Sequence, residues 1–67
     1  MSVLKVIELM ASSEKSWEDA VKNAVETAGK TLKGIRSVWI QDQSAVVKDG
    51  KIAEFRVNCK ITFEVFD

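Results

Sequence analysis

The sequence has no histidine and only one cysteine, Cys59. A single thiol excludes an internal disulfide, and without histidine it cannot complete an ordinary zinc site. The absence of histidine also removes the usual proton carrier near neutral pH. The glycines, Gly29, Gly34 and Gly50, are too scattered for a phosphate-binding loop. No nucleophile has a visible base, and we therefore do not expect an enzyme.

A net charge is also missing. The chain carries 10 basic and 10 acidic residues, interspersed without a block of one sign. Such a pattern offers no electrostatic footprint for nucleic acid or for an anionic membrane. The apolar run over residues 3–10 is too short to span a membrane and is interrupted by Lys5 and Glu8. We expect no nucleic-acid or membrane partner, and a cytoplasmic location in which Cys59 stays reduced.

The chain is short, with 67 residues that we treat as a single domain, 1–67. At this length, folding removes only about 60% of the unfolded surface from water. Small domains of this kind need a further stabilising device. Because a disulfide and a zinc site are excluded, oligomerisation is the device that remains.

Strict alternation of apolar and polar residues over 54–65 predicts a long, half-buried β-strand. A strand of this length extends more than about 30 Å. A compact chain of this size has a diameter of only about 28 Å. The strand should therefore overhang its own globule, and it must curl around a helix or meet another subunit.

Two further elements precede this strand. Residues 3–10 are β-branched and apolar on both parities, which predicts a strand covered on both faces. Ser16, with Asp19 reaching back to a free backbone amide, predicts the start of a helix. Apolar residues from Trp17 to Leu32 recur at spacings of three and four, and Gly34 is placed to end that helix.

Asp49-Gly50 lies between two β-rich runs and predicts a tight type I′ hairpin turn. Counting outward from this turn gives one sheet face that meets the helix and one that points away. The predicted pairs on the helix side are Val47 with Ile52, Ser44 with Phe55, Asp42 with Val57, Ile40 with Cys59 and Val38 with Ile61. The predicted pairs on the opposite side are Gln43 with Arg56, Gln41 with Asn58, Trp39 with Lys60 and Ser37 with Thr62. Asp42 and Ser44 fit poorly against a helix, which predicts a bulge near them.

Trp39 is the only aromatic residue on the face that points away from the helix. Burial of an indole is worth a few kcal/mol, so we expect something to cover it. One interpretation is a subunit interface, where tryptophan and arginine are enriched. The other is a stacking platform for a planar ligand at such an interface, with Arg56 or Lys60 supplying charge.

The order of these elements resembles that of the dodecins, which are small flavin-binding proteins. The resemblance covers residues 3–66 and rests on the spacing of several short motifs. These motifs are Lys5-Val6-Ile7-Glu8-Leu9 entering the segment 11–16, an alanine-rich helix ending Thr31-Leu32-Lys33, the hairpin, and the closing Phe63-Glu64-Val65. The resemblance implies an α+β fold of order β-α-β-β, with a three-stranded antiparallel sheet partly wrapped around one helix. It also implies a hollow homo-dodecamer of cubic symmetry with flavins between subunits.

In flavin-binding dodecins, a tryptophan early in the second strand stacks on the isoalloxazine ring and a glutamine in the third strand hydrogen-bonds its edge. These positions correspond to Ser37 and Arg56 here. Serine has no ring face, and arginine has donors but no acceptor. Trp39 then either stacks on a ligand from a shifted position or fills the vacated site. Family members without flavin also carry arginine at the glutamine position and resemble this chain in Ser16-Trp17 and Ile35-Arg36.

The sequence thus leaves three functional hypotheses. The first is a storage shell for flavin (riboflavin, FMN or FAD) or a related planar anion, with Ser37, Trp39, Arg56 and Lys60 as site residues. The second is a dodecamer that binds divalent cations such as calcium through carboxylates repeated by symmetry. Its candidate ligands are Glu8, Asp42, Glu54 and Glu64, which otherwise serve as a solvated face or as partners of Lys5, Lys51 or Lys60. The third is a purely structural oligomer.

Overall fold

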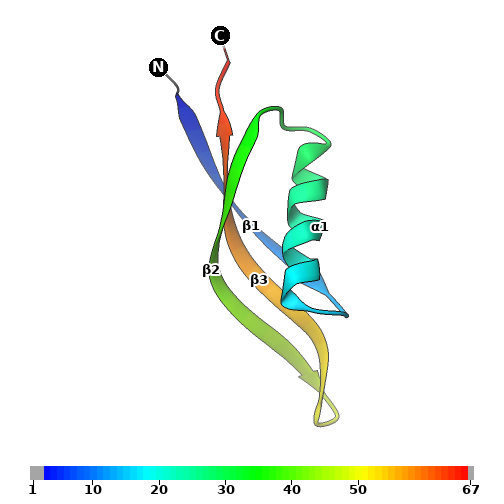
Figure 1. Ribbon diagram of the computed structural model, residues 1–67. Helices are drawn as coiled ribbons and strands as arrows, with labels where there is room; N and C mark the ends of the chain where they lie inside the picture. Colours follow the sequence, from blue (N-terminus) through cyan, green and yellow to red (C-terminus); the bar gives the residue numbers. More distant parts are fainter. Residues whose placement is uncertain (1–2, 67) are drawn as a thin grey trace.

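The computed structural model describes residues 3–66 and contains one helix and one sheet. The elements are β1 (Leu4–Ser13), α1 (Trp17–Gly29), β2 (Ile35–Lys48) and β3 (Lys51–Glu64). The strands are antiparallel in the order β1-β3-β2, and α1 lies against one face of the sheet (Figure 1). The expected α+β fold with element order β-α-β-β is confirmed.

The start of the helix is capped by its own side chains. The Ser16 hydroxyl accepts a hydrogen bond from the Asp19 backbone N–H at 3.0 Å, as predicted. The Asp19 carboxylate does not reach back to a backbone amide; its Oδ2 accepts from the Ser13 hydroxyl at 2.7 Å instead. Since Ser13 ends β1, this bond ties the helix to the preceding strand.

The helix ends earlier than predicted. α1 stops at Gly29, and Gly34, with φ of 73°, lies in the loop before β2. The N–H groups of Lys30 and Thr31 donate to the carbonyls of Thr27 and Ala28, three residues earlier, which tightens and closes the last turn. The last residue of the helix, Gly29, has a low helix propensity, which favours an end at this point.

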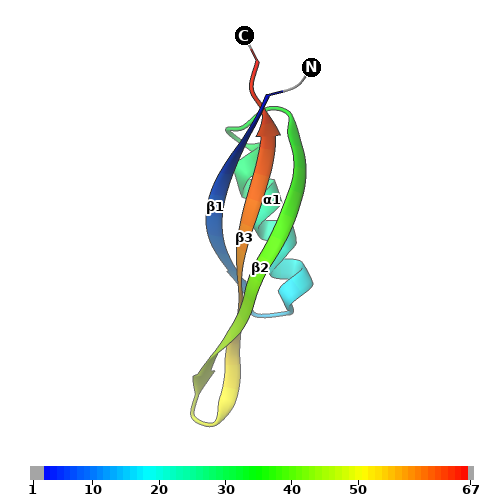
Figure 2. The ribbon, with the colours of Figure 1, turned by 90° about the vertical axis from the view of Figure 1, so that its left-hand side faces the viewer.

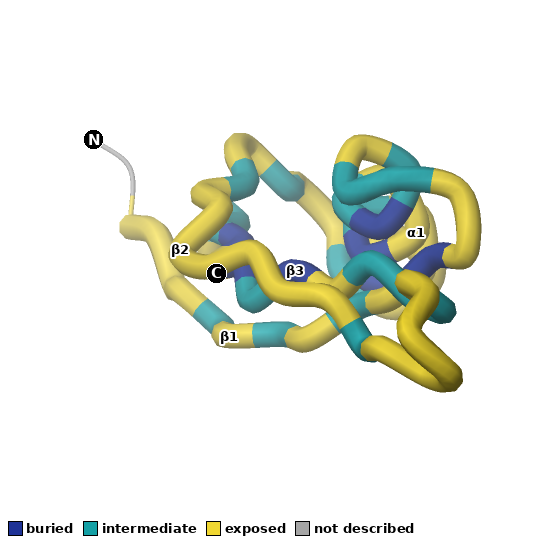
Figure 3. The backbone as a smooth tube through the Cα atoms, turned by 90° about the horizontal axis from the view of Figure 1, so that it is seen from below, coloured by how far each residue is buried: buried dark blue, intermediate teal, exposed yellow. Residues whose placement is uncertain are grey.

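The core lies between α1 and the central strand β3. The helix contributes Ala20, Ala24 and Ala28, whose small side chains let it approach the sheet closely, and β3 contributes fully buried residues. The buried residues of β3 are Val57, Cys59 and Ile61. Figure 3 shows these buried segments of α1 and β3 in the interior.

Trp17, in the first turn of α1, closes one end of this core. Its ring packs edge-on against Phe55, with the ring centroids 4.9 Å apart and the planes at 75°. Its indole N–H donates to the Ser44 carbonyl at 2.9 Å. The helix is thereby fixed to both β2 and β3 at this end.

The predicted register between β2 and β3 is right at both ends of the paired segment and wrong in the middle. The pairs that agree are Val47 with Ile52, Ile40 with Cys59, Trp39 with Lys60, Val38 with Ile61 and Ser37 with Thr62. Between them each β2 partner is shifted by one, so Gln43, not Asp42, lies opposite Val57, and Ala45, not Ser44, lies opposite Phe55.

Two irregularities of opposite sense cause this shift. One between Ile40 and Asp42 leaves Gln41 as an extra residue on β2, and one near Val46 and Val47 leaves Ala53 as an extra residue on β3. The expected bulge is therefore present. It moves Asp42 and Ser44 off the helix side, where the sequence had placed them, to positions opposite Asn58 and Arg56.

The molecule is elongated, with extents of 50 × 20 × 13 Å and a radius of gyration of 13.7 Å. A compact chain of this length would have a radius of gyration of about 11 Å. β1 ends opposite Phe55, so residues 46–54 continue beyond it as a two-stranded hairpin arm (Figure 2). β3 does extend beyond the three-stranded part of the sheet, but at its hairpin end, residues 51–54, and not along the segment 55–64 that is paired with β1.

Candidate functional site: the outer face of the sheet

The outer face is the side of the sheet turned away from α1. On β1 and β3 it carries every second residue, because side chains alternate along a strand and paired residues share a face. The β1–β3 pairs on it are Leu4 with Glu64, Val6 with Thr62, Glu8 with Lys60, Met10 with Asn58 and Ser12 with Arg56. Ser37, Trp39, Asp42 and Ser44 extend these rows onto β2. All of the residues expected to bind a ligand therefore lie on one face.

Among residues 3–66, Trp39 is the most exposed large apolar residue, at 71%. Together with Gln41 and Lys60 it lines an open pocket of about 280 Å³ on the outer face. Lys60 lies opposite Trp39 in the register and opposite Glu8 on its other side. The pocket thus combines an aromatic plane, an amide and an ammonium group.

Of the four predicted cofactor-binding residues, the structure brings only Trp39 and Lys60 into this pocket. Ser37 lies in the neighbouring row, where its Oγ is 2.5 Å from Oγ1 of Thr62. Arg56 lies between Ser12 and Ser44, with the row of Asn58 separating it from Lys60. Sequence reasoning placed Gln41 on this face but did not connect it with the site, since only the pocket shows that it adjoins Trp39.

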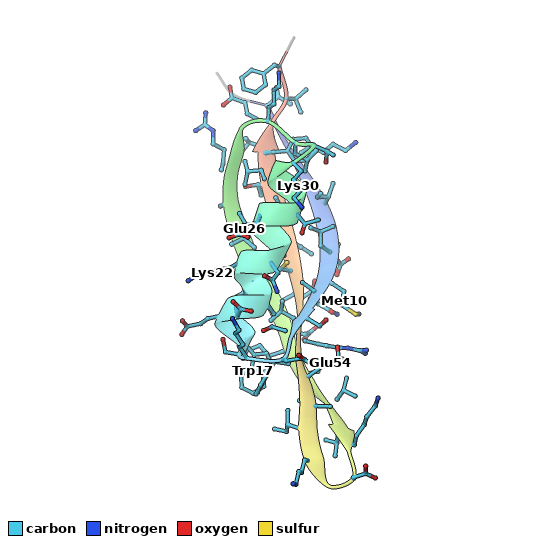
Figure 4. The ribbon with its side chains drawn as sticks, turned by 90° about the vertical axis from the view of Figure 1, so that its right-hand side faces the viewer. Met10, Trp17, Lys22, Glu26, Lys30 and Glu54 are labelled. Carbon is cyan, nitrogen blue, oxygen red and sulfur yellow. The ribbon has the colours of Figure 1, made fainter. Side chains whose placement is uncertain are left out.

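The candidate metal ligands are spread over the outer face. Glu8 lies beside Lys60, and Asp42, which the bulge brings to this face, lies beside Asn58. Glu54 lies opposite Val46 in the hairpin arm, and Figure 4 shows it at the level of the Trp17 end of α1.

Glu64 is already engaged, because its carboxylate forms an ion pair with Arg36. The sequence had offered lysines as its partner. Arg36 is the extra residue where the register shifts between Ile35 and Ser37, which lets it meet Glu64. Across residues 3–66, no three Asp, Glu, Cys or His side chains come together to hold a metal ion.

Exposed apolar side chains lie along the β1 edge of the outer face. Leu4, Val6 and Met10 of β1 are each at least half exposed, with Met10 at 66%. The expectation that β1 is covered on both faces therefore does not hold within a single chain. Exposed apolar residues and an exposed tryptophan on the same sheet face are typical of a surface that another molecule covers.

Cys59 lies on the opposite, helix-facing side and is fully buried. Burial raises the pKa of its thiol above the ordinary value. A protonated, enclosed thiol serves as a small apolar group and not as an accessible nucleophile. No helix within residues 3–66 has both the length and the apolarity required to cross a membrane.

Comparison with known proteins agrees with this architecture. The sequence profile of the family described as Dodecin matches residues 3–66. A protein of Mycobacterium tuberculosis named calcium dodecin is 31% identical over 65 residues, which cover 97% of this chain and 92% of that protein. A crystal structure of calcium dodecin from the same organism, described as having a novel calcium-binding site, superposes with a TM-score of 0.85 at 33% identity and covers 97% of this chain and 93% of that one. A dodecin structure from Streptomyces coelicolor superposes with a TM-score of 0.95 at 26% identity and covers 98% of this chain and 94% of that one.

Proposed function

Because the chain belongs to the dodecin family, we propose that it is a binding and storage protein that assembles into a hollow homo-dodecamer and holds its ligand between subunits. The observation that carries the proposal is the exposed indole of Trp39 beside Lys60 on the outer face. An indole left in water forfeits a few kcal/mol of burial free energy, which contact with a sister copy and a ligand recovers.

The ligand class follows from the side chains at the pocket. The indole of Trp39 offers a flat apolar face for a planar ring, and Lys60 offers a positive charge beside it. Arg56 is a further cation on the same face, and Ser37 is the neighbour of Trp39 on the same strand face. We therefore assign a flavin (riboflavin, FMN or FAD) or a related planar anion as the stored molecule.

Fluorescence titration tests this assignment. Recombinant protein is added to riboflavin and to FMN, and quenching of the flavin emission is followed. The proposal predicts saturable quenching and a yellow colour in protein purified from flavin-rich cells. Unquenched emission with protein at tens of micromolar contradicts it.

A second candidate, calcium binding, is favoured by the similarity to the calcium dodecin of Mycobacterium tuberculosis. Calcium takes about 6 to 8 oxygen ligands, so carboxylates from several copies would have to meet. Glu8, Asp42 and Glu54 are the candidates on this chain, whereas Glu64 is paired with Arg36.

Calorimetry with calcium chloride at neutral pH tests this alternative. If the carboxylates of the outer face bind calcium, Asp42→Asn should reduce the heat of binding. Glu26→Gln, on the exposed side of α1, is the matched control and should leave it unchanged. A calcium heat that neither variant changes would place the ion elsewhere. If neither flavin nor calcium binds, a purely structural shell remains.

A further inference from the structure

Gln41 occupies an unusual position in the sheet. It is the extra residue of the bulge between Ile40 and Asp42, so it has no partner on β3. Bulges of this kind re-aim side chains and occur next to functional sites. The side chain of Gln41 lines the pocket that Trp39 and Lys60 form.

We propose that Gln41, Trp39 and Lys60 together form the binding site, in which the Gln41 amide hydrogen-bonds the polar edge of a planar heteroaromatic anion stacked on Trp39. The inference rests on the proposed storage function and adds the residue that recognises the ligand. It places the site between the row of Ser37 and Thr62 on one side and the row of Ser44 and Arg56 on the other.

The chemistry of the three groups is complementary to one ligand class. A glutamine amide provides a carbonyl acceptor and two N–H donors, which match a ring edge that carries both donors and acceptors. Lys60 provides a charge for a phosphate or another anionic substituent. Among residues 3–66, neither the Gln41 amide nor the Lys60 ammonium is engaged in a hydrogen bond or ion pair, so both are available to a ligand.

The positions indicated by the family resemblance are less suited to this role. The Ser37 hydroxyl is hydrogen-bonded to Thr62, and Arg56 is separated from Lys60 by the row of Asn58. One ring system stacked on Trp39 would contact Gln41 and Lys60 before it reached Arg56.

The pocket is open and holds about 280 Å³, close to the lower end of the range of about 300 to 1,000 Å³ for small-molecule sites. A single copy therefore contacts only one face of the ligand. The second face of the ligand needs a cover, and the exposed apolar residues Val6 and Met10, which lie on β1 of the same sheet face, point to a sister copy as that cover. The site is thus completed by assembly.

The test measures the affinity of the assembled protein for riboflavin and for FMN by fluorescence quenching. Gln41→Leu should weaken binding of both by about five- to tenfold, the effect of losing one or two hydrogen bonds. Gln43→Leu is the matched control, since Gln43 lies opposite Val57 on the helix side of the sheet, and it should bind as wild type does. Gln41→Asn should recover part of the loss.

Lys60→Met separates the role of charge from that of the ring. It should weaken FMN by about tenfold and leave riboflavin nearly unchanged, because only FMN carries a phosphate. Each variant is passed over a sizing column first, so that a change in affinity is read only from assembled protein.

The outcomes distinguish this inference from the proposed function. If wild type binds and Gln41→Leu binds equally well, the inference is overturned while the storage function stands. If the loss follows Ser37→Ala and Arg56→Leu instead, the ligand lies at the family position and the inference is again overturned. If wild type binds neither flavin, both the function and the inference are overturned.

Discussion

Trp39 of β2 and Lys60 of β3 are partners across the sheet and line one pocket on its outer face. The pair bears on both subunit assembly and ligand binding, because the same indole can anchor an interface or support a ligand. Its exposure in the single chain indicates that one of these contacts, or both, completes the molecule.

Trp39→Ala tests the role of the indole in assembly. Truncation of a central aromatic anchor typically costs an interface about 2 kcal/mol or more. We expect the variant to dissociate at higher protein concentration than wild type does, as measured by light scattering across a dilution series. The control is Trp17→Phe, which keeps an aromatic ring against Phe55 inside the core. Unchanged assembly of Trp39→Ala together with weaker ligand binding would assign the indole to the ligand alone.

The double variant Ser37→Trp/Arg56→Gln tests the alignment with flavin-binding dodecins. It supplies an aromatic face and an amide at the two positions where the resemblance expects them. If the alignment is right, FMN affinity rises above that of wild type. The experiment is repeated in the Trp39→Ala background, which removes any obstruction by the native indole. No gain in either background would mean that Ser37 and Arg56 do not correspond to the family site.

Ile61→Ala tests the location of the core. Ile61 is 0% exposed on the helix side of β3, and loss of a buried isoleucine typically costs about 2 to 5 kcal/mol. Ile52→Ala removes the same atoms from a residue of the hairpin arm that is 55% exposed. Chemical denaturation at one protein concentration should therefore show a much lower midpoint for Ile61→Ala than for Ile52→Ala. Equal midpoints would contradict the assignment of the core.

The pH dependence of stability follows from Cys59. Burial raises the pKa of its thiol, so the folded chain keeps this proton at a pH where the unfolded chain has released it. The contribution is fully present below the ordinary thiol pKa of about 8.5, and the free energy of unfolding falls as the pH rises above it. The stability of wild type relative to Cys59→Ala should therefore decrease between about pH 8 and pH 10, in the presence of a phosphine reductant. A difference that does not change with pH would contradict the burial of the thiol.

Most of the fold follows from local patterns in the sequence. The Asp49-Gly50 turn and the alternation along β3 are sufficient to place Trp39 opposite Lys60 and Ile40 opposite Cys59. This works because the extra Gln41 on β2 and the extra Ala53 on β3 cancel over the length of the hairpin.

The middle of the hairpin could not be predicted in the same way. The alternation of polar and apolar residues shows that Asp42 and Ser44 would face the helix in an unbroken register, which does not suit polar side chains. It does not show at which residue the register shifts. The shifted segment also makes tertiary contacts that alternation does not report, such as the hydrogen bond from the Trp17 indole to the Ser44 carbonyl. For the same reason the predicted partner of Asp42 was wrong, and the place of Gln41 beside Trp39 in the pocket was not predicted.

The ligand site is harder still to predict, because it depends on contacts between residues that are far apart in the sequence. Four residues were expected to bind a cofactor. Because side chains alternate along a strand, the sequence was enough to place all four on the same face of the sheet. Which of them share a pocket depends on the spacing of rows across β1, β3 and β2, and the cover that we propose for that pocket comes from another copy of the chain. The sequence of one chain does not encode that second contact in any local pattern.

The central claim is that sister copies shield the outer face of the sheet, including Trp39. Native mass spectrometry of the purified protein at micromolar concentration, combined with an absorption spectrum of the same sample, tests it most directly. The account predicts a particle with the mass of a dodecamer of the 7.5 kDa chain. A stable species of 7.5 kDa as the sole component would contradict it.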